Sequence, residues 1–333
     1  MLRIPVEQWI FSELDHCWLQ ELSEEFYIDN PFCVLCDTET KDIGRIATES
    51  GKIGMKIGEC LVCGHIQKSR AVNFKLFNDH FSKKWLVKRK NRRFVKNEEP
   101  FNKIKKYIQP NSKVLEIGCG SGTNLKSFQE SGFEVWGFDP SESEIEIAQE
   151  NNIPNVSVST AEEYLKNIKF EFDVIFLRDV LNFIYSPYEI LTKYLDVLKP
   201  NGLFMTSNGS FYKNQFIASC HHATHFNHPT LSALERWASS NSLQILYKSD
   251  QPTFLLARKN NFTHQHEPHS KEINWENKVF NQILRFNFRR PFSNKKKINS
   301  LRDVKLGKHS AFIHEPNLVE FYYKTNNPPV ILK

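Results

Sequence analysis

The middle of the chain alternates short apolar runs with amphipathic stretches. The amphipathic stretches predict helices at Asn124–Ser131, Ser143–Asn151 and Pro187–Leu198. Apolar runs typical of buried strands lie at Lys113–Ile117, Glu134–Asp139, Val156–Ser159, Phe172–Leu177, Leu203–Ser207, Leu243–Lys248 and Thr253–Ala257. Strands that alternate with helices favour a doubly wound, mostly parallel sheet, so we expect an α/β fold.

The rest of the chain lacks this alternation and divides by composition. We expect five parts: a helical lead-in over 1–30, a cysteine-bearing β-ribbon over 31–70, a basic, aromatic-containing helical linker over 71–99, the α/β domain over 100–260, and a C-terminal extension of unknown role over 261–333. A length of 333 residues agrees with two domains, or with one large domain that carries appendages.

Composition excludes several classes of protein. A hydrophobic content of 40% with 13 Gly and 15 Pro excludes collagen and low-complexity disorder. The longest strongly apolar run lies near Val174–Leu177, far short of the roughly 18 residues of a membrane span. The N-terminal stretch meets acidic residues too early for a signal peptide. We therefore expect a cytoplasmic protein without a membrane span.

Four of the seven cysteines form two CxxC pairs, Cys33 with Cys36 and Cys60 with Cys63. The 23 residues between the pairs match a four-cysteine zinc ribbon, in which each pair supplies two thiolates to one tetrahedral ion. Four cysteines leave no open position on the ion, so we expect structural Zn²⁺. The alternative, a redox CxxC motif, comes singly and beside a βαβ unit. The remaining cysteines, Cys17, Cys119 and Cys220, are expected to be small buried side chains.

A glycine-rich loop follows the first predicted strand of the α/β domain. The segment Val114–Gly122 runs from that strand through Gly118, Gly120 and Gly122 into a helix. Asp139 ends the next strand, where a carboxylate can accept the hydroxyls of a ribose. A dinucleotide loop would read GxGxxG, whereas this loop reads GxGxG after Glu116. An acid there would repel a pyrophosphate but suits the cationic amino-acid part of a sulfonium cofactor.

This segment resembles motif I of the class I S-adenosylmethionine-dependent methyltransferases. The resemblance continues through Gly137–Ser141, Phe172–Ile175 and Leu198–Gly202 and covers roughly residues 100–258. It implies a Rossmann-like seven-stranded sheet, preceded here by the zinc ribbon and followed by the extension. It also implies that the enzyme takes S-adenosyl-L-methionine as its methyl donor.

The resemblance assigns cofactor contacts to individual residues. The methionine part is implied to be held by Glu116 with Gly118, Cys119, Gly120 and Gly122. The ribose is implied to be held by Asp139 with Pro140, and the adenine by Ala161 with Glu162. Two alternatives stay open: Glu162 as a carboxylate that only stabilises a helix start, and Asp139 with a surface role.

The stretch after the fourth strand departs from the family. Many relatives carry His-Val-Leu-Glu-His there, whereas this chain has Asp179-Val-Leu-Asn-Phe183, followed by Ser186-Pro187. Asp179 is a candidate for both cofactor binding and catalysis because of its position. The alternative is that it only caps the following helix.

A zinc ribbon joined to a methyltransferase is similar to the enzymes that act on nucleotide-linked deoxysugars and related metabolites. Their loop after the fifth strand corresponds to Ser219–Leu231, and His222 takes the place of the family histidine. A histidine there can act as a general base. We expect His222, His225 or Asp179 to serve catalysis. Ser219 and His221 replace the Tyr and Glu of the sugar C-methyltransferases, which leaves O- or N-methylation open. A metal-binding or purely structural histidine loop is the alternative.

Clustered cations raise the possibility of nucleic acid as a partner. Basic residues crowd Lys83–Lys96 and recur in the tail, although the net charge is only +6. A zinc-finger-bearing RNA methyltransferase is therefore the second hypothesis, after a small-molecule enzyme. The third is a non-catalytic zinc-ribbon interaction protein, which the intact Glu116, glycine loop and Asp139 disfavour.

Overall fold

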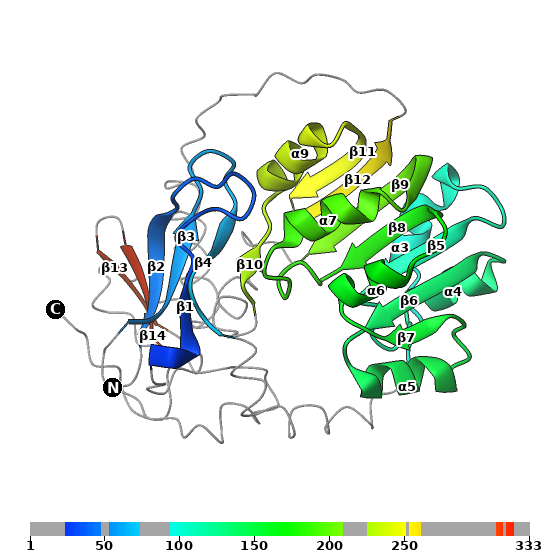
Figure 1. Ribbon diagram of the computed structural model, residues 1–333, viewed down its shortest axis with the longest axis horizontal. Helices are drawn as coiled ribbons and strands as arrows, with labels where there is room; N and C mark the ends of the chain where they lie inside the picture. The colour runs from blue at the N-terminus through cyan, green and yellow to red at the C-terminus, as the bar shows by residue number, and fades with distance from the viewer. Residues whose placement is uncertain are drawn as a thin grey trace, which may run out of the picture. The chain divides into compact units, whose positions relative to one another are not determined.

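The computed structural model describes residues 24–47, 53–73, 94–208, 225–250, 253–260, 311–315 and 318–322 (Figure 1). The chain divides into two compact units. The ribbon unit comprises Met1–Ser82, Gly209–Thr230 and Ser270–Lys333, and the α/β unit comprises Lys83–Asn208 and Leu231–His269.

The α/β unit contains a seven-stranded sheet in the order β11-β12-β9-β8-β5-β6-β7. Its strands are β5 (Lys113–Ile117), β6 (Glu134–Asp139), β7 (Val156–Val158), β8 (Phe172–Arg178), β9 (Leu198–Asn208), β11 (Leu243–Asp250) and β12 (Thr253–Lys259). Strands β5 to β9 are parallel, and β12 runs antiparallel to both β9 and β11. The seven predicted strands and the mostly parallel, Rossmann-like sheet are confirmed.

Helices cover both faces of this sheet (Figure 1). They are α3 (Glu99–Ile104) with the 3-10 turn η3 (Lys105–Tyr107), α4 (Leu125–Glu130), α5 (Glu142–Glu150), α6 (Ala161–Asn167), α7 (Pro187–Leu195) and α9 (Leu231–Ser240). On one face Phe128 of α4 stacks on Phe176, with ring centroids 5.4 Å apart. On the other face Trp237 of α9 packs on Phe204 at 5.0 Å. Burial of these rings stabilises the packing of the helices on the sheet, because large aromatic side chains remove much apolar area from water.

The helix predicted over Pro187–Leu198 is shorter than expected. Helix α7 ends at Leu195, and β9 already begins at Leu198. Asn201 takes a positive φ of 62°, a conformation that asparagine tolerates better than most residues. The polar residues before Gly202 therefore belong to the start of a long strand and not to the end of the helix.

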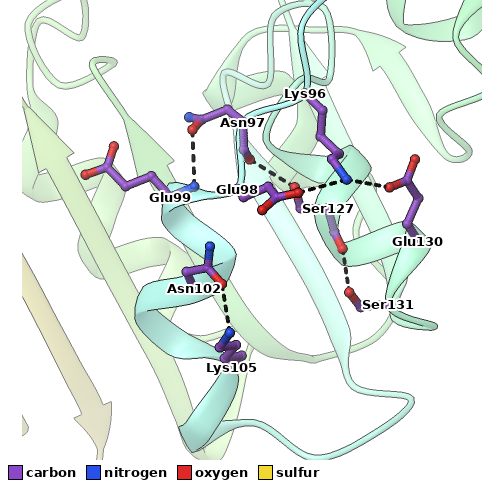
Figure 2. Close-up of polar contacts among 9 residues, drawn as sticks. All are labelled: Lys96, Asn97, Glu98, Glu99, Asn102, Lys105, Ser127, Glu130 and Ser131. Atoms are coloured by element: carbon purple, nitrogen blue, oxygen red, sulfur yellow. Dashed lines mark hydrogen bonds and ion pairs between the residues drawn. The ribbon is translucent and has the colours of Figure 1, made fainter.

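The segment that enters the α/β unit is fastened to α4 by polar contacts (Figure 2). Lys96 forms ion pairs with Glu98 at 2.9 Å and Glu130 at 2.8 Å. Ser127 donates a hydrogen bond to the Asn97 carbonyl at 3.1 Å. The Asn97 side chain accepts one from the Glu99 amide at 3.2 Å, which satisfies a free N–H at the start of α3.

The ribbon unit has its own, mainly antiparallel sheet in the order β1-β4-β3-β2-β14-β13, with β10 paired to β4. The strands are β1 (Tyr27–Asp29), β2 (Lys41–Ala47), β3 (Ile53–Glu59), β4 (Ile66–Val72), β10 (Asn227–His228), β13 (Ala311–Glu315) and β14 (Leu318–Tyr322). The antiparallel β-ribbon predicted around the cysteines is present. The C-terminal extension adds β14, which pairs with β2 in parallel.

The predicted helical lead-in is wrong where the structure describes it. Glu24–Phe26 form a single 3-10 turn, and Tyr27–Asp29 form a strand, because they pair with the far end of β4. Residues 1–23 and 74–93, which hold the rest of the lead-in and most of the predicted linker, lie outside the described residues. Among the described helices, none combines the length and apolar character needed to cross a membrane.

Candidate functional site

The glycine loop leaves β5 and takes a backbone that only glycine adopts readily. Gly118, Gly120 and Gly122 have φ values of 67°, 51° and 76°. A Cβ on Gly118 would lie 2.5 Å from Val180, and one on Gly122 would lie 2.8 Å from Ile153. At Gly120 the nearest atom would be Glu144 Oε2 at 3.6 Å. The loop is thus packed against protein at its ends and open at its centre, as a ligand cradle requires.

Glu116 points from β5 into the interior beneath this loop. Its side chain is only 1% exposed. Oε1 accepts a hydrogen bond from Asn124 Nδ2 at 2.5 Å, while Oε2 has no hydrogen-bond partner. Burial raises the pKa of Glu116 well above its usual value, and the charge of Asp139 adds to the shift. A buried carboxylate with a free oxygen fits the cationic ammonium of a methionine group, which would satisfy that oxygen.

A short relay of side-chain amides holds Glu116 in place. Asn97 Nδ2 donates to Asn124 Oδ1 at 2.6 Å, and Asn124 in turn donates to Glu116. The backbone N–H of Asn97 also donates a hydrogen bond to the Thr123 carbonyl at 2.9 Å. The segment before α3 therefore orients the carboxylate through Asn124, a link that the sequence analysis missed because the residues stand apart in the chain.

Asp139 ends β6 directly beside the glycine loop. Its Oδ2 accepts from the Gly120 amide at 3.0 Å, and its Oδ1 accepts from the Ser141 amide at 2.9 Å, with Pro140 between them. The structure thus brings Glu116, the glycine loop and Asp139 together at the carboxyl edge of adjacent parallel strands.

The other predicted cofactor residues lie either against β6 or in the first turn of α6. The Cys119 side chain is buried against β6, where a Cβ on Gly137 would meet its sulfur at 2.8 Å, and burial raises the pKa of its thiol. Ala161 and Glu162 form the first turn of α6, which Thr160 and Glu163 start with a reciprocal capping box. Glu162 lies in this first turn, where the helix dipole favours a carboxylate, so its adenine contact stays a prediction beside the helix-start alternative.

Asp179 follows β8 at the same carboxyl edge and takes a positive φ of 55°. Its amide donates to the Ser207 carbonyl at 2.8 Å, and its carboxylate lies 3.7 Å from Arg178 Nε. Arg178 also pairs with Glu99 at 3.2 Å. The helix-cap alternative for Asp179 fails, because the N-cap of α7 is Ser186.

Two aromatic side chains follow Asp179 and were not predicted as site residues. Phe183 and Tyr185 are 45% and 40% exposed, although most large apolar side chains of this unit are buried. Large apolar residues placed in the turn after a strand, instead of within it, are a sequence signal that could have identified them.

Neither predicted histidine belongs to the described part of the α/β unit. His222 lies outside the described residues. His225 is described and belongs to the ribbon unit, directly before Phe226 and β10.

The four paired cysteines meet in the ribbon unit. Their sulfurs all lie within 4.8 Å of one another. The two knuckles share one backbone design: Asp37 and Gly64, which follow the second cysteine of each pair, have φ values of 54° and 73°. Their amides donate to the carbonyls of Cys33 and Cys60 at 2.9 and 2.7 Å. Two matching turns that aim four sulfurs at one point fit a tetrahedral ion.

Hydrogen bonds to sulfur prepare this cluster for a cation. The amides of Leu35 and His65 donate to Cys33 and Cys63, each at 3.4 Å. Hydrogen bonds among the sulfurs lower the pKa of the thiols of Cys36 and Cys60 and raise the pKa of those of Cys33 and Cys63. The thiolate is the form that binds metal.

Known proteins are similar to the α/β unit. Residues 88–248 match the family described as a methyltransferase domain. The ubiquinone biosynthesis O-methyltransferase of Coxiella burnetii (strain Dugway 5J108-111) is 28% identical over 151 residues, 40% of this chain and 64% of that protein. The same enzyme of Pseudomonas fluorescens (strain SBW25) is 30% identical over 103 residues, 29% of this chain and 44% of that protein.

Solved structures also align with the chain. Magnesium protoporphyrin IX methyltransferase (ChlM) from Synechocystis PCC 6803, with bound SAH, aligns at a TM-score of 0.42 and 15% identity. That alignment covers 49% of this chain and 81% of that protein. The chain thus matches only part of the length of each of these relatives.

Proposed function

We propose that residues 88–248, which match the methyltransferase domain family, form a class I S-adenosylmethionine-dependent methyltransferase domain, and that the chain transfers a methyl group to a small-molecule acceptor. A sugar, a nucleotide-linked sugar or a related metabolite is the acceptor class that the paired zinc ribbon favours. The observation that carries the proposal is Glu116, buried beneath the glycine loop with one carboxylate oxygen that has no partner.

The chain's own residues bind and orient the cofactor in this proposal. S-adenosylmethionine supplies the methyl group from its sulfonium. Glu116 and the loop Gly118–Gly122 hold the methionine part, Asp139 with Pro140 holds the ribose, and Ala161 with Glu162 borders the adenine. Asp139 is already fixed by two backbone amides, so its position costs no reordering when the ribose arrives.

The acceptor is proposed to bind where the turn after β8 exposes Phe183 and Tyr185. These rings offer an apolar surface beside Asp179, on which a sugar face or a planar metabolite can pack. Methyl transfer then depends on alignment, with the nucleophile held roughly 3 Å from the methyl carbon. His222, His225 and Asp179 remain the proposed groups that position the nucleophile or accept its proton.

Calorimetry with S-adenosylmethionine tests the cofactor assignment. We expect binding to the full-length protein that Asp139→Ala weakens, because the ribose loses its acceptor. Glu163→Ala is the matched control, since it removes a carboxylate that only caps α6. Binding of NADH without binding of S-adenosylmethionine would contradict the proposal.

An assay with labelled methyl donor against two pools, total small metabolites and total RNA, tests the acceptor class. Label in the metabolite pool supports the proposal, and label only in RNA favours the RNA methyltransferase. Of the basic run, Lys96 is described, and it is paired with Glu98 and Glu130 within the protein. No label in either pool, despite cofactor binding, would favour the non-catalytic interaction protein.

We also propose that Cys33, Cys36, Cys60 and Cys63 hold a structural Zn²⁺. Elemental analysis should find about one zinc per chain, as expected for a single four-cysteine site. Cys33→Ser should abolish it, whereas Cys119→Ser should not, since Cys119 lies in the other unit. Unchanged zinc content in Cys33→Ser would place the ligands elsewhere.

A further inference from the structure

The second cysteine knuckle contacts a segment that lies more than 150 residues away in sequence. This segment, His225–Thr230, contains β10 and is here called the clamp segment. Asn227 and His228 pair with Gln67 and Ile66 of β4, and the Phe226 carbonyl accepts a hydrogen bond from the Lys68 amide at 2.8 Å. The clamp segment thus adds a strand to the ribbon sheet at the point where β4 leaves the knuckle.

Two further hydrogen bonds join the clamp segment to the knuckle itself. Thr230 Oγ1 donates to the carbonyl of Gly64 at 2.9 Å. His65 Nε2 and Asn227 Oδ1 lie 2.9 Å apart. The amide oxygen can only accept a hydrogen bond, so His65 Nε2 is the donor. The groups that form these two hydrogen bonds belong to Gly64, His65, Asn227 and Thr230, and all four residues are buried. Water therefore does not replace a partner that is lost.

The residues that receive these bonds are held by the cysteines. Gly64 and His65 directly follow Cys63. The Gly64 amide donates to the Cys60 carbonyl at 2.7 Å, and the Cys60 amide donates to the His65 carbonyl at 2.8 Å. The His65 amide donates to Cys63 Sγ at 3.4 Å. The conformation of Gly64 and His65 therefore depends on the turn that the metal would close.

The clamp segment also has a fixed place in the methyltransferase chain. Thr230 directly precedes Leu231, the first residue of α9, and the histidine-bearing loop 219–225 leads into it. A bound metal would thus set the conformation of the residues directly before α9.

We infer that the metal knuckle positions the clamp segment: Asn227 and Thr230 are positioning residues that transmit the order of the Cys60–Cys63 turn to the residues directly before α9. The functional consequence rests on the proposed function, in which His225 of this segment is a candidate catalytic group. The coupling between metal and clamp segment does not rest on it. Because coupling is reciprocal, a clamp segment that the metal orders must also retain the metal.

Zinc release to a chromophoric chelator from the zinc-loaded full-length protein tests the coupling. Asn227→Ala and Thr230→Val should each release zinc about tenfold faster, as expected for one buried hydrogen bond lost. Ser69→Ala is the control: it removes a part-buried hydrogen bond to Asp42, at 2.7 Å, from the same strand, and its release rate should stay unchanged. Wild-type release rates in both clamp variants would overturn the inference, and so would equal acceleration in Ser69→Ala.

Hydrogen exchange gives a second readout that does not depend on activity. The amides of the clamp segment should be protected in the zinc-loaded wild type and less protected in Asn227→Ala with zinc still bound. Equal protection in the two proteins would overturn the inference. Both measurements keep their meaning if no methyl acceptor is ever found, so failure of the proposed function and failure of the coupling are distinguishable.

Discussion

At the scale of single residues, the chemistry of the site rests on Glu116. In Glu116→Gln, the amide keeps the shape and the contact with Asn124 but loses the charge that faces the ammonium. A hydrogen bond to a charged group is worth about 1.5–3 kcal/mol, so S-adenosylmethionine should bind roughly 10- to 100-fold more weakly. Glu130→Gln, an exposed carboxylate paired with Lys96, should bind as the wild type does. Unchanged affinity in Glu116→Gln would remove Glu116 from the cofactor site.

The raised pKa of Glu116 also predicts how stability depends on pH. Below the unfolded-state value of 4.5 the carboxyl is protonated in both states, and its burial costs no charge. As the pH rises toward the raised folded-state pKa, the unfolded chain loses the proton first, so the cofactor-free protein becomes less stable. Glu116→Gln should lack this decline. Denaturant unfolding of both proteins at several pH values above 4.5 checks it, and parallel pH profiles would contradict the assignment.

His222 carries the prediction with the largest effect on turnover. If it accepts the proton of the acceptor, His222→Ala should lower turnover by about 10²–10⁴. Cofactor affinity should barely change, because the proposed cofactor contacts lie on β5, β6 and α6. His221→Ala, next in the chain, is the control. Near-wild-type turnover in His222→Ala would shift the role to His225 or Asp179, and joint loss of cofactor binding would indicate a structural loop.

The candidate cofactor residues could be predicted from the sequence because each lies at or near the end of a strand that its neighbouring residues identify. Glu116 is the second-last residue of one predicted strand and Asp139 ends the next, and parallel strands bring their carboxyl ends to one edge. Asn97 was missed because its contact with Asn124 spans 27 residues and no periodic pattern marks it. Local patterns thus predict where a residue stands in its element, but not which distant side chain orients it.

At the scale of elements, the strand–loop–helix turn at Gly118 can be compared with an ordinary helix end at Gly132. Both have positive φ values, 67° and 84°. An added Cβ would clash with Val180 at Gly118 but would meet nothing within 4 Å at Gly132. Gly132→Ala should therefore cost only the backbone strain of about 1–2 kcal/mol. Gly118→Ala should lower the free energy of unfolding by about 1–3 kcal/mol more, because the added methyl group overpacks the site. It should also abolish cofactor binding. Equal losses of unfolding free energy would mean that the loop yields to the added methyl group.

The elements themselves were predictable where they carry a pattern of their own. Runs such as Phe172–Arg178 are mostly apolar over a full strand length, so the run alone identifies the strand, although its partner β5 lies about 60 residues away. Tyr27–Asp29 and Asn227–His228 are too short to carry a pattern, and each becomes a strand only because β4 offers it an unpaired edge. Strand formation there follows from pairing across the chain, which no local window contains.

At the scale of the whole molecule, the two units have separate sheets, so we expect metal removal and cofactor binding to affect two different unfolding transitions. Metal removal should destabilise the ribbon unit, because structural zinc contributes its binding free energy directly to folding. The α/β unit carries its own core around Phe128 and Phe176 and does not contain the four cysteines. Chelation should therefore lower or abolish one calorimetric transition and leave the other close to its original temperature.

Cofactor binding should act on the transition that chelation spares. A ligand at 100 times its dissociation constant adds about 2.7 kcal/mol to the state it binds. S-adenosylmethionine should thus raise the midpoint of the remaining transition in the zinc-free protein, and Asp139→Ala should reduce that rise. Differential scanning calorimetry with and without chelator, each with and without S-adenosylmethionine, separates the outcomes. A single transition that both treatments shift together would mean that the two units unfold as one, and that the ribbon contributes stability to the cofactor site as well as order to the clamp segment.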